Sequence, residues 1–318
     1  MKLLNLKISF KKSLLLINLK IFKNIFFFLS ISYFIYHLII YFRLKISVLD
    51  FENLSILLFF SLLSCILSIF FNGLAWKDII RWFGSQSKID NLVRFYVLTN
   101  SLKYVPGSVW HFVERFNFLK NKTNKNFAFY GILMEPYFML CSSLTLTSIG
   151  VIYNPIFLLF LLPSIFLHRD LIYFIIIKME SIKNTGVKIL KITNTKSKFD
   201  SSIKINSPFP FRILFIEMLF ILFKFIGFIL CFHIFNPGND FDYLYIFIIF
   251  CLSWSIGLIV PAAPGGLGIF EASFLLFFRE VNFYNNLLIC LIVFRFISSS
   301  ADIVLSAPLL IKKVIRGN

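Results

Sequence analysis

Charged residues are scarce in this sequence. Only 15% of its 318 residues are Asp, Glu, Lys or Arg, whereas 58% are hydrophobic, and its mean hydropathy is +0.85. A chain this apolar cannot close around one aqueous core and still present a polar surface, which argues against a soluble globular domain of any size. A bilayer is the solvent that suits it. The sequence therefore predicts an all-α, polytopic transmembrane helix bundle.

Acidic residues are the scarcer of the charged types. The chain has 15 Asp and Glu against 32 Lys and Arg, a net charge of +17. Such an excess would ordinarily suggest binding to nucleic acid, but the cations lie in loops between apolar stretches and form no basic domain or reading motif. The positive-inside rule of membrane proteins explains them better. We expect no nucleic-acid partner.

The sequence also lacks the spacings typical of metal and catalytic sites. Its five cysteines lie inside or at the edge of apolar segments without a C-x-x-C pair, and its four histidines are scattered. The cysteines read as small buried hydrophobic residues, and we expect no metal and no cofactor. The motifs G-x-S-x-G, H-E-x-x-H and G-x-x-x-x-G-K-[ST] are absent from the sequence. The lack of a catalytic constellation argues against an enzyme.

Long apolar runs predict about eight membrane spans. A spanning helix needs about 20 mostly apolar residues. The candidates are Ile25–Phe42, Leu54–Ala75, Phe127–Tyr153, Ile156–Ile177, Phe211–Phe235, Tyr243–Val260 and Leu287–Ile311, and a marginal one is Leu267–Phe283. Whether 267–283 crosses is left open. His168-Arg169-Asp170 interrupts the fourth candidate, and we expect that helix to end there, with Leu171–Ile177 lying in the interface.

The charges between these runs predict the topology. Residues 1–24 carry six lysines between apolar residues and are expected to form a cytoplasmic interfacial segment. Residues 25–311 form a single transmembrane domain, in which the Lys-rich loop between 177 and 211 is cytoplasmic. Residues 312–318, with Lys312, Lys313 and Arg316, form a cytoplasmic tail. Both termini are then inside, which requires an even number of crossings.

The segment Tyr96–Phe112 is predicted to be re-entrant. Basic residues flank it on both sides, including Lys88 and Arg94 before it and Lys120 and Lys122 after it. Eight crossings satisfy every loop only if this segment enters the membrane and returns on the same side. Non-helical backbone at membrane depth is tolerated only where protein or a water-filled cavity covers it, so such a segment points to function.

Two stretches rich in Pro and Gly interrupt the apolar background. The first reads KYVPGSVW (103–110) and is followed by Arg115, and the second reads PAAPGGLGIFE (261–271). Pro and Gly break the helical hydrogen-bond ladder and leave backbone groups free. Transporters hold ionic groups at half-helix ends of this kind. The alternative interpretation is that both stretches are helix kinks or tight interfacial turns.

In order and spacing, the two motifs resemble the lysylphosphatidylglycerol synthase transmembrane family, also described as flippase-like integral membrane proteins. The resemblance covers essentially the whole chain and implies lipid handling in a bacterial cytoplasmic membrane. Where the motifs of the family match this sequence, the resemblance assigns a site role to Tyr104, Pro106, Gly107, Trp110 and Arg115 in the first motif. In the second motif it assigns one to Pro264, Gly265, Gly266, Gly268 and Glu271. All ten are expected to contact a lipid headgroup.

The chain departs from the family in two respects. Ser108 stands where a Lys or another polar residue is frequent, which removes one charge that would face a phosphate. The sequence contains no soluble aminoacyltransferase domain, so we expect no lysyl transfer by this chain alone. The resemblance implies membrane lipids with anionic or lipid-linked headgroups as partners, and a separate synthase or glycosyltransferase as a further one.

Ionisable residues inside the apolar runs are the remaining signal. A charge at the bilayer centre costs about 2.5 to 3.5 kcal/mol on insertion scales and therefore usually faces protein. Seven residues make two helical turns, so Glu217 and Lys224 share one helix face, as do Arg295 and Asp302. Glu135 and Glu271 are further candidates. These charges form either interhelical ion pairs or a polar path for a headgroup, in which Arg295 and Lys224 meet phosphate. We expect Arg115, Glu271 and Arg295 to line one polar cavity.

Three functions therefore stay open at this point. The first is a lipid flippase or another lipid-handling transporter. The second is a membrane-embedded transferase, or an accessory subunit, in glycolipid or aminoacyl-lipid synthesis. It would need a carboxylate base such as Glu271 or Glu135 within reach of a substrate hydroxyl. The third is a purely structural role.

Overall fold

The computed structural model describes residues 51–84, 89–105, 109–176, 178, 205–235, 241–259, 266, 268–278 and 284–315. Within these ranges the regular structure is helical, and none of it is β-strand. The predicted all-α fold is thereby confirmed for the described part of the chain. The predictions for residues 1–24, for the span at 25–42 and for most of the loop at 178–204 lie outside it.

Four helices are long and apolar enough to cross a membrane. They lie at Ser55–Trp82, Lys125–Ile152, Phe211–Phe235 and Asn286–Pro308. The first lies within α2 (Phe51–Trp82), the second joins α5 (Lys125–Thr147) to a 3-10 turn (Ser148–Ile152), the third is α8 (Phe211–Phe235), and the fourth lies within α11 (Tyr284–Ile315). Each coincides with a predicted span. Helix α11 continues to Ile315, so the first residues assigned to the tail are helical.

The other predicted spans are shorter or broken. Helix α9 (Tyr243–Ile259) has 17 residues, and α10 (Ile269–Leu276) has 8, about 12 Å of helix, which is far less than a bilayer core of about 30 Å. The stretch Pro155–Ile165, which ends in α6 (Leu162–Ile165), and the helix Arg169–Ile176 meet at a bend of 66°. The break predicted at residues 168–170 is confirmed. The described residues thus hold four spans, or five if the bent pair counts as one, and the predicted eight are not confirmed.

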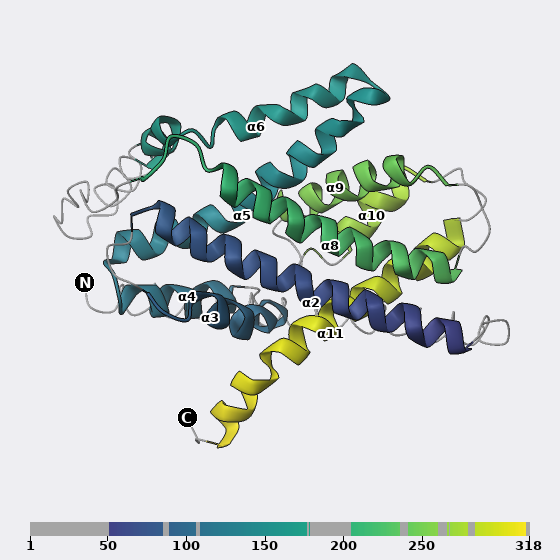
Figure 1. Cartoon of the computed structure of the whole chain (residues 1–318), viewed down its shortest axis with the longest axis horizontal. Coiled ribbons are helices and arrows are strands. Elements are labelled where there is room, and N and C mark those ends of the chain that lie inside the picture. Colours follow the sequence, from purple (N-terminus) through teal and green to yellow (C-terminus); the bar gives the residue numbers. More distant parts are fainter. Residues whose placement is uncertain are drawn as a thin grey trace, which may run out of the picture.

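Helices α2 and α8 lie side by side through the length of the bundle (Figure 1). Ser61 donates a hydrogen bond to the Gly227 carbonyl at 2.7 Å, and Ser64 donates one to the Phe223 carbonyl at 2.6 Å. A Cβ on Gly227 would lie 3.0 Å from the sulfur of Cys65. Small residues let helix backbones approach closely in membranes, which is the packing seen here.

Two apolar clusters fill the bundle. The first is rich in Phe and joins α8, α9, α10 and α11 to one half of α2. The second joins the other half of α2 to α3, α4, α5 and the start of α8. Large apolar side chains also cover the outer surface: Phe59, Phe60 and Phe215 are 62%, 51% and 62% exposed. An apolar surface of this kind is matched by a bilayer, which agrees with the predicted membrane insertion.

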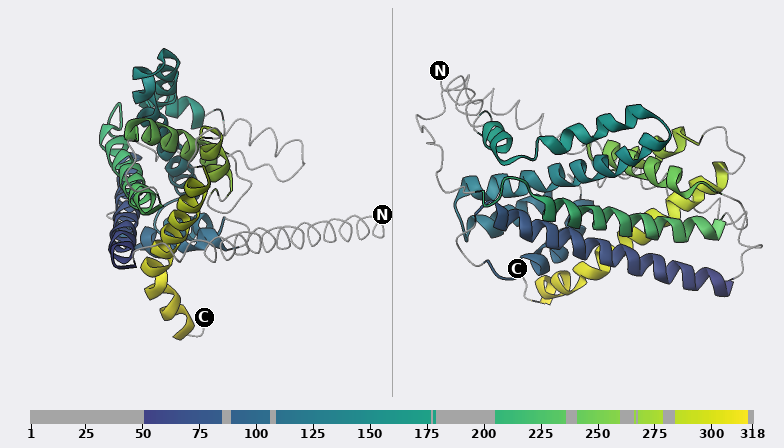
Figure 2. Two further views of the ribbon diagram at one scale, coloured as in Figure 1. Left: turned by 90° about the vertical axis from the view of Figure 1, so that its right-hand side faces the viewer. Right: turned by 45° about the horizontal axis from the view of Figure 1, so that its top comes forward.

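Residues 92–120 form a helical hairpin that packs beside α2, next to the crossing of α11 (Figure 2). It consists of α3 (Leu92–Thr99), the 3-10 helix η2 (Asn100–Tyr104) and α4 (Trp110–Lys120). The ring of Phe95 stacks on that of Phe118 with 4.0 Å between their centroids, so the start of α3 lies against the end of α4. Helices α3 and α4 therefore run in opposite directions.

Candidate functional site

Helix α11 carries a stripe of four buried polar residues. Arg295, Ser298, Asp302 and Ser306 are spaced by three, four and four residues, which places them on one helix face. Their exposed fractions are 7%, 5%, 0% and 0%. Since charged groups are costly against lipid, a stripe of this kind must be matched by polar partners inside the protein. Its two ends meet the two Pro-Gly motifs.

Arg295 holds the second motif. Its Nε forms an ion pair with Glu271 of α10, and its Nη2 donates a hydrogen bond to the Gly266 carbonyl at 3.3 Å. The guanidinium carbon lies 4.7 Å from the ring centroid of Phe270 and 5.9 Å from that of Trp254. The structure therefore brings Glu271 and Arg295 together, as the sequence predicts, between two aromatic rings.

Backbone geometry explains two glycines of this motif. Gly266 has a φ of +70°, and a Cβ there would lie 3.2 Å from the carbonyl oxygen of Gly257 in α9. Gly268 has a φ of +85°, and its N–H donates to Glu271 Oε2 at 2.7 Å, which satisfies one of the free donors at the start of α10. Glu271 thus uses one oxygen to close its own helix and the other to bind α11.

Asp302 holds the first motif. It accepts hydrogen bonds from Asn100 Nδ2 and from the Tyr104 hydroxyl, both at 2.6 Å, and forms an ion pair with Lys103 Nζ at 2.8 Å. One turn further, Ser306 accepts a hydrogen bond from the backbone N–H of Ser101 at 3.3 Å. The 3-10 helix of the hairpin is therefore fixed to α11 about 10 Å from Arg295, since seven residues separate the two anchors.

Arg115 lies in a sealed cluster behind this anchor. Its Nη1 is 2.7 and 2.8 Å from the two oxygens of Glu135 in α5, and the Tyr96 hydroxyl also donates to Glu135, at 2.7 Å. Arg115 Nη2 donates to Asn100 Oδ1 at 3.2 Å. Arg115 is 0% exposed. Because Asn100 also donates to Asp302, one hydrogen-bonded network runs from α5 through the hairpin to α11.

The charged residues of α8 behave differently from each other. Lys224 is buried and donates to Ser298 of the stripe at 2.6 Å. Glu217, two turns away, is also buried, and neither of its oxygens has a hydrogen-bond partner within the described residues. The predicted common inward face is confirmed. Within the described part of the chain, each of the other three predicted acids has a basic partner instead: Glu135, Glu271 and Asp302.

The remaining predicted residues are placed as follows. Trp110 begins α4 and is 47% exposed. Pro106, Gly107, Pro264 and Gly265 lie outside the described residues. The contacts divide the expected cavity residues between two clusters, with Arg115 on Glu135 and with Arg295 on Glu271. One cavity shared by Arg115, Glu271 and Arg295 therefore stays a prediction. Among the described residues, no three His, Cys, Asp or Glu lie close enough together to hold a metal ion.

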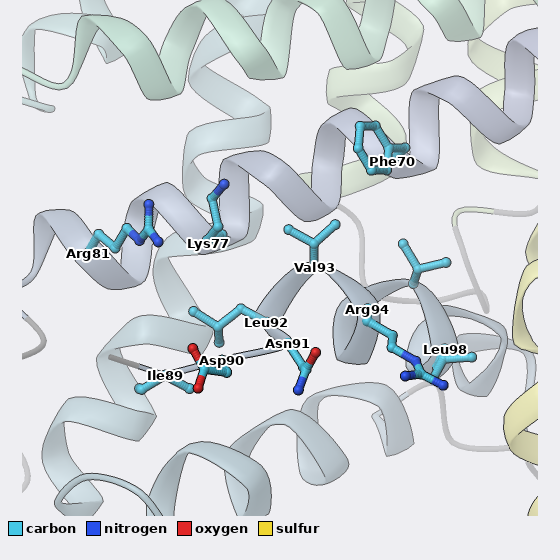
Figure 3. Close-up of a pocket in the computed structure, with 11 residues that line it drawn as sticks. Phe70, Lys77, Arg81, Ile89, Asp90, Asn91, Leu92, Val93, Arg94 and Leu98 are labelled. Atoms are coloured by element: carbon cyan, nitrogen blue, oxygen red, sulfur yellow. The ribbon is translucent and has the colours of Figure 1, made fainter. Parts of the chain in front are cut away.

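A pocket of about 540 Å³ lies between α2 and α3. Lys77 and Arg81 line it from α2, and Asp90 and Arg94 line it from the start of the hairpin. In Figure 3 the head groups of Lys77 and Arg94 point in opposite directions, so these two cations do not converge on one anion. None of the predicted site residues lines this pocket.

Several network residues were not predicted from the sequence. Tyr96, Asn100, Lys103 and Ser298 each contribute a hydrogen bond or an ion pair to the charged residues described above. A signal for Ser298 was present, because it lies three residues after Arg295 and four before Asp302 in an apolar run. Tyr96 and Asn100 are likewise four residues apart, at helical spacing.

The fold and these contacts define a helical membrane protein with two broken segments attached to one polar helix face. No protein-family model matches the chain, and no curated protein matches its sequence. The resemblance to the lysylphosphatidylglycerol synthase transmembrane family therefore stays a prediction, and the functional argument rests on the site itself.

Proposed function

We propose that this chain is a flippase-like transporter for a lipid with an anionic or lipid-linked headgroup, similar to the family that its motifs resemble. One observation carries the proposal: the broken segments of both motifs are attached to the same buried polar stripe, at Arg295 and at Asp302. Broken helices whose free backbone groups face a polar centre are the usual binding sites of transporters.

The Arg295 end of the stripe is the part suited to bind a headgroup. The side chains of Arg295 and Glu271 are 8% and 16% exposed, whereas that of Arg115 is 0% exposed. The planar guanidinium binds phosphate in the same bidentate geometry as carboxylate, so a lipid phosphate replaces Glu271 without loss of pairing. Phe270 and Trp254 beside the guanidinium limit access of water to the exchange.

The geometry disfavours the transferase alternative. A general base must accept a proton from the substrate, so its carboxylate has to be open to the substrate hydroxyl. Both oxygens of Glu135 are bonded to Arg115, and one of them also accepts from Tyr96. Both oxygens of Glu271 are likewise bonded, to Arg295 and to the Gly268 N–H. A carboxylate bound in this way is a structural partner of its cation.

The proposal includes the topology. We place the chain in a bacterial cytoplasmic membrane with an even number of crossings, both termini in the cytoplasm, and the hairpin 92–120 re-entrant from the cytoplasmic side. The stacking of Phe95 on Phe118 supports the hairpin, since it brings both basic flanks to one end. Single cysteines at Asp90 and at Lys122 should react with a membrane-impermeant reagent from the same side. Reaction from opposite sides would contradict the re-entrant assignment.

Lipid transport is tested with the purified protein in vesicles that contain fluorescent phosphatidylglycerol. A quencher added outside reports how fast the labelled lipid reaches the outer leaflet. We expect transport above that of protein-free vesicles, its loss in Arg295→Ala, and partial transport in Arg295→Lys, which keeps the charge but not the planar fork. The matched control is Arg169→Ala, because Arg169 pairs with its exposed neighbour Asp170. Unchanged transport in Arg295→Ala would refute the site.

A further inference from the structure

The junction of α2, α5 and α8 gathers buried polar atoms that have no partner. Ser61 and Ser64 of α2 bond to Gly227 and Phe223 of α8, and further along Asp78 pairs with Arg212. These pairs fix an antiparallel register, in which Asn72 lies level with Glu217 and Trp76 lies one turn further along α2.

Four atoms at this level lack a hydrogen-bond partner within the described residues. They are both carboxyl oxygens of Glu217, the amide oxygen of Asn72 and the indole nitrogen of Trp76. The amide nitrogen of Asn72 lies 3.8 Å from the sulfur of Met139, which connects this group to α5, one turn from Glu135. Buried polar groups are nearly always bonded, so a cluster of unpaired ones calls for a bound species.

Within the described residues Glu217 forms no ion pair. On α5 the nearest charged group is Glu135, whose charge acts on Glu217 and which is itself bonded to Arg115 and Tyr96. Helix α9 has no Asp, Glu, Lys, Arg or His over its length. Charged groups on α2, α8 and α11 are bonded elsewhere: Asp78 to Arg212, Lys224 to Ser298, Arg295 to Glu271, and Asp302 to Lys103. Lys77 and Arg81 of α2 line the pocket beside α3.

We propose that Glu217 is an intramembrane proton-binding site, which carries a proton in the conformation described here and releases it when the junction opens to water. A buried carboxylate without a partner is much costlier than the neutral acid, whose O–H is a donor that a water at this level can accept. The proton leaves to water, and the carboxylate that remains is then hydrated. Ionisable residues inside membranes commonly form such relays in transporters.

Proton binding at Glu217 is inferred from the contacts at the junction of α2, α5 and α8 alone. Coupling of the proton to lipid movement rests in addition on the proposed function. If both hold, a proton gradient is the energy source of transport. The tests are therefore separate, one on the protein without transport and one on transport.

The first test is infrared spectroscopy of the purified protein in phosphatidylglycerol vesicles. We expect the carbonyl stretch of a protonated carboxyl in an apolar environment in neutral buffer, and its loss in Glu217→Gln. The control is Asp170→Asn, since the side chain of Asp170 is 68% exposed, and it should keep the band. An identical band in the wild type and in Glu217→Gln overturns the proposal. Size-exclusion chromatography and circular dichroism confirm that each variant is folded.

The second test repeats the phosphatidylglycerol assay with a proton gradient across the vesicle membrane. Wild-type transport should change with the direction of the gradient, and in Glu217→Gln the ratio of transport with and without the gradient should fall to one. A response to an equal sodium gradient, with none to protons, overturns proton coupling. Transport absent from every variant, together with the Glu217 carboxyl band, would remove the proposed function and leave the proton site in place.

Discussion

Truncation of Glu135 is expected to destabilise the protein severely, because it leaves Arg115 as an uncompensated buried charge. Arg115 is 0% exposed, and after Glu135→Ala its polar neighbours are the hydroxyl of Thr99, the amide of Asn100 and the Tyr96 carbonyl. Removal of one partner from a buried ion pair costs about 3 to 5 kcal/mol. The Tyr96 hydroxyl also loses its acceptor, which places Glu135→Ala toward the upper end of that range.

Two further variants separate charge from hydrogen bonding. Glu135→Gln keeps an acceptor for Arg115 and Tyr96 but removes the negative charge. Its loss of unfolding free energy should therefore be smaller than that of Glu135→Ala, about 1.5 to 3 kcal/mol, which is the contribution of one hydrogen bond to a charged group. The double variant Arg115→Met with Glu135→Met removes both charges. Replacement of a whole buried pair by apolar residues is often close to neutral, so the double variant should recover most of the loss.

The measurement is equilibrium unfolding in mixed micelles of detergent and dodecyl sulfate, followed by tryptophan fluorescence. Trp76 is a built-in probe, since the guanidinium carbon of Arg115 lies 5.8 Å from its ring centroid. Arg169→Ala is the control, because an exposed ion pair contributes about 1 kcal/mol or less. A loss below about 1 kcal/mol in Glu135→Ala would refute the sealed cluster, as would a double variant no more stable than the single one.

Two other predictions concern the second motif and the surface. Gly266→Ala should reduce lipid transport and stability more than Gly268→Ala, because both glycines have positive φ but only Gly266 meets backbone, at 3.2 Å, while a Cβ on Gly268 has no atom within 4 Å. The Tyr153 hydroxyl bonded to Asp242 holds the pKa of that carboxyl below 3.8. This contribution to stability is present above the unfolded pKa and is lost as pH falls through the folded pKa. The unfolding midpoints of wild type and Tyr153→Phe should therefore differ near neutrality and converge in acid.

The membrane spans were predictable because their signal is local. A helix that crosses a bilayer satisfies its own backbone and needs only a continuous apolar run, so Phe211–Phe235 was predicted with the bounds that the structure gives. The prediction was least accurate for the length of a helix. An apolar run alone does not reveal that α10 ends at Leu276, whereas the charges at residues 168–170 did indicate the break at which the chain bends by 66°.

The sequence identified individual charged residues of the site, but it did not show which of them form ion pairs with each other. Charges within apolar runs identified Glu135, Glu271 and Arg295 one by one, and the resemblance of the first motif identified Arg115. Pairing of Arg115 with Glu135 depends on how the hairpin packs against α5, which no local spacing encodes. The Glu271–Arg295 pair likewise depends on how α10 packs against α11, which no local spacing encodes.

The carboxylates at the two ends of the α11 stripe differ in exposure, and this difference assigns the two ends different roles. Asp302 is 0% exposed and is bonded to Asn100, Lys103 and Tyr104 of the hairpin, of which the Lys103 side chain is 23% exposed. At Arg295 the pair is 8% and 16% exposed, and one of its partners is a backbone carbonyl at a break. A ligand exchanges only where the resident pair is reachable and its release does not leave a sealed charge. Loss of Asp302 should therefore appear as unfolding, whereas loss of Arg295 should appear as lost transport in a folded protein.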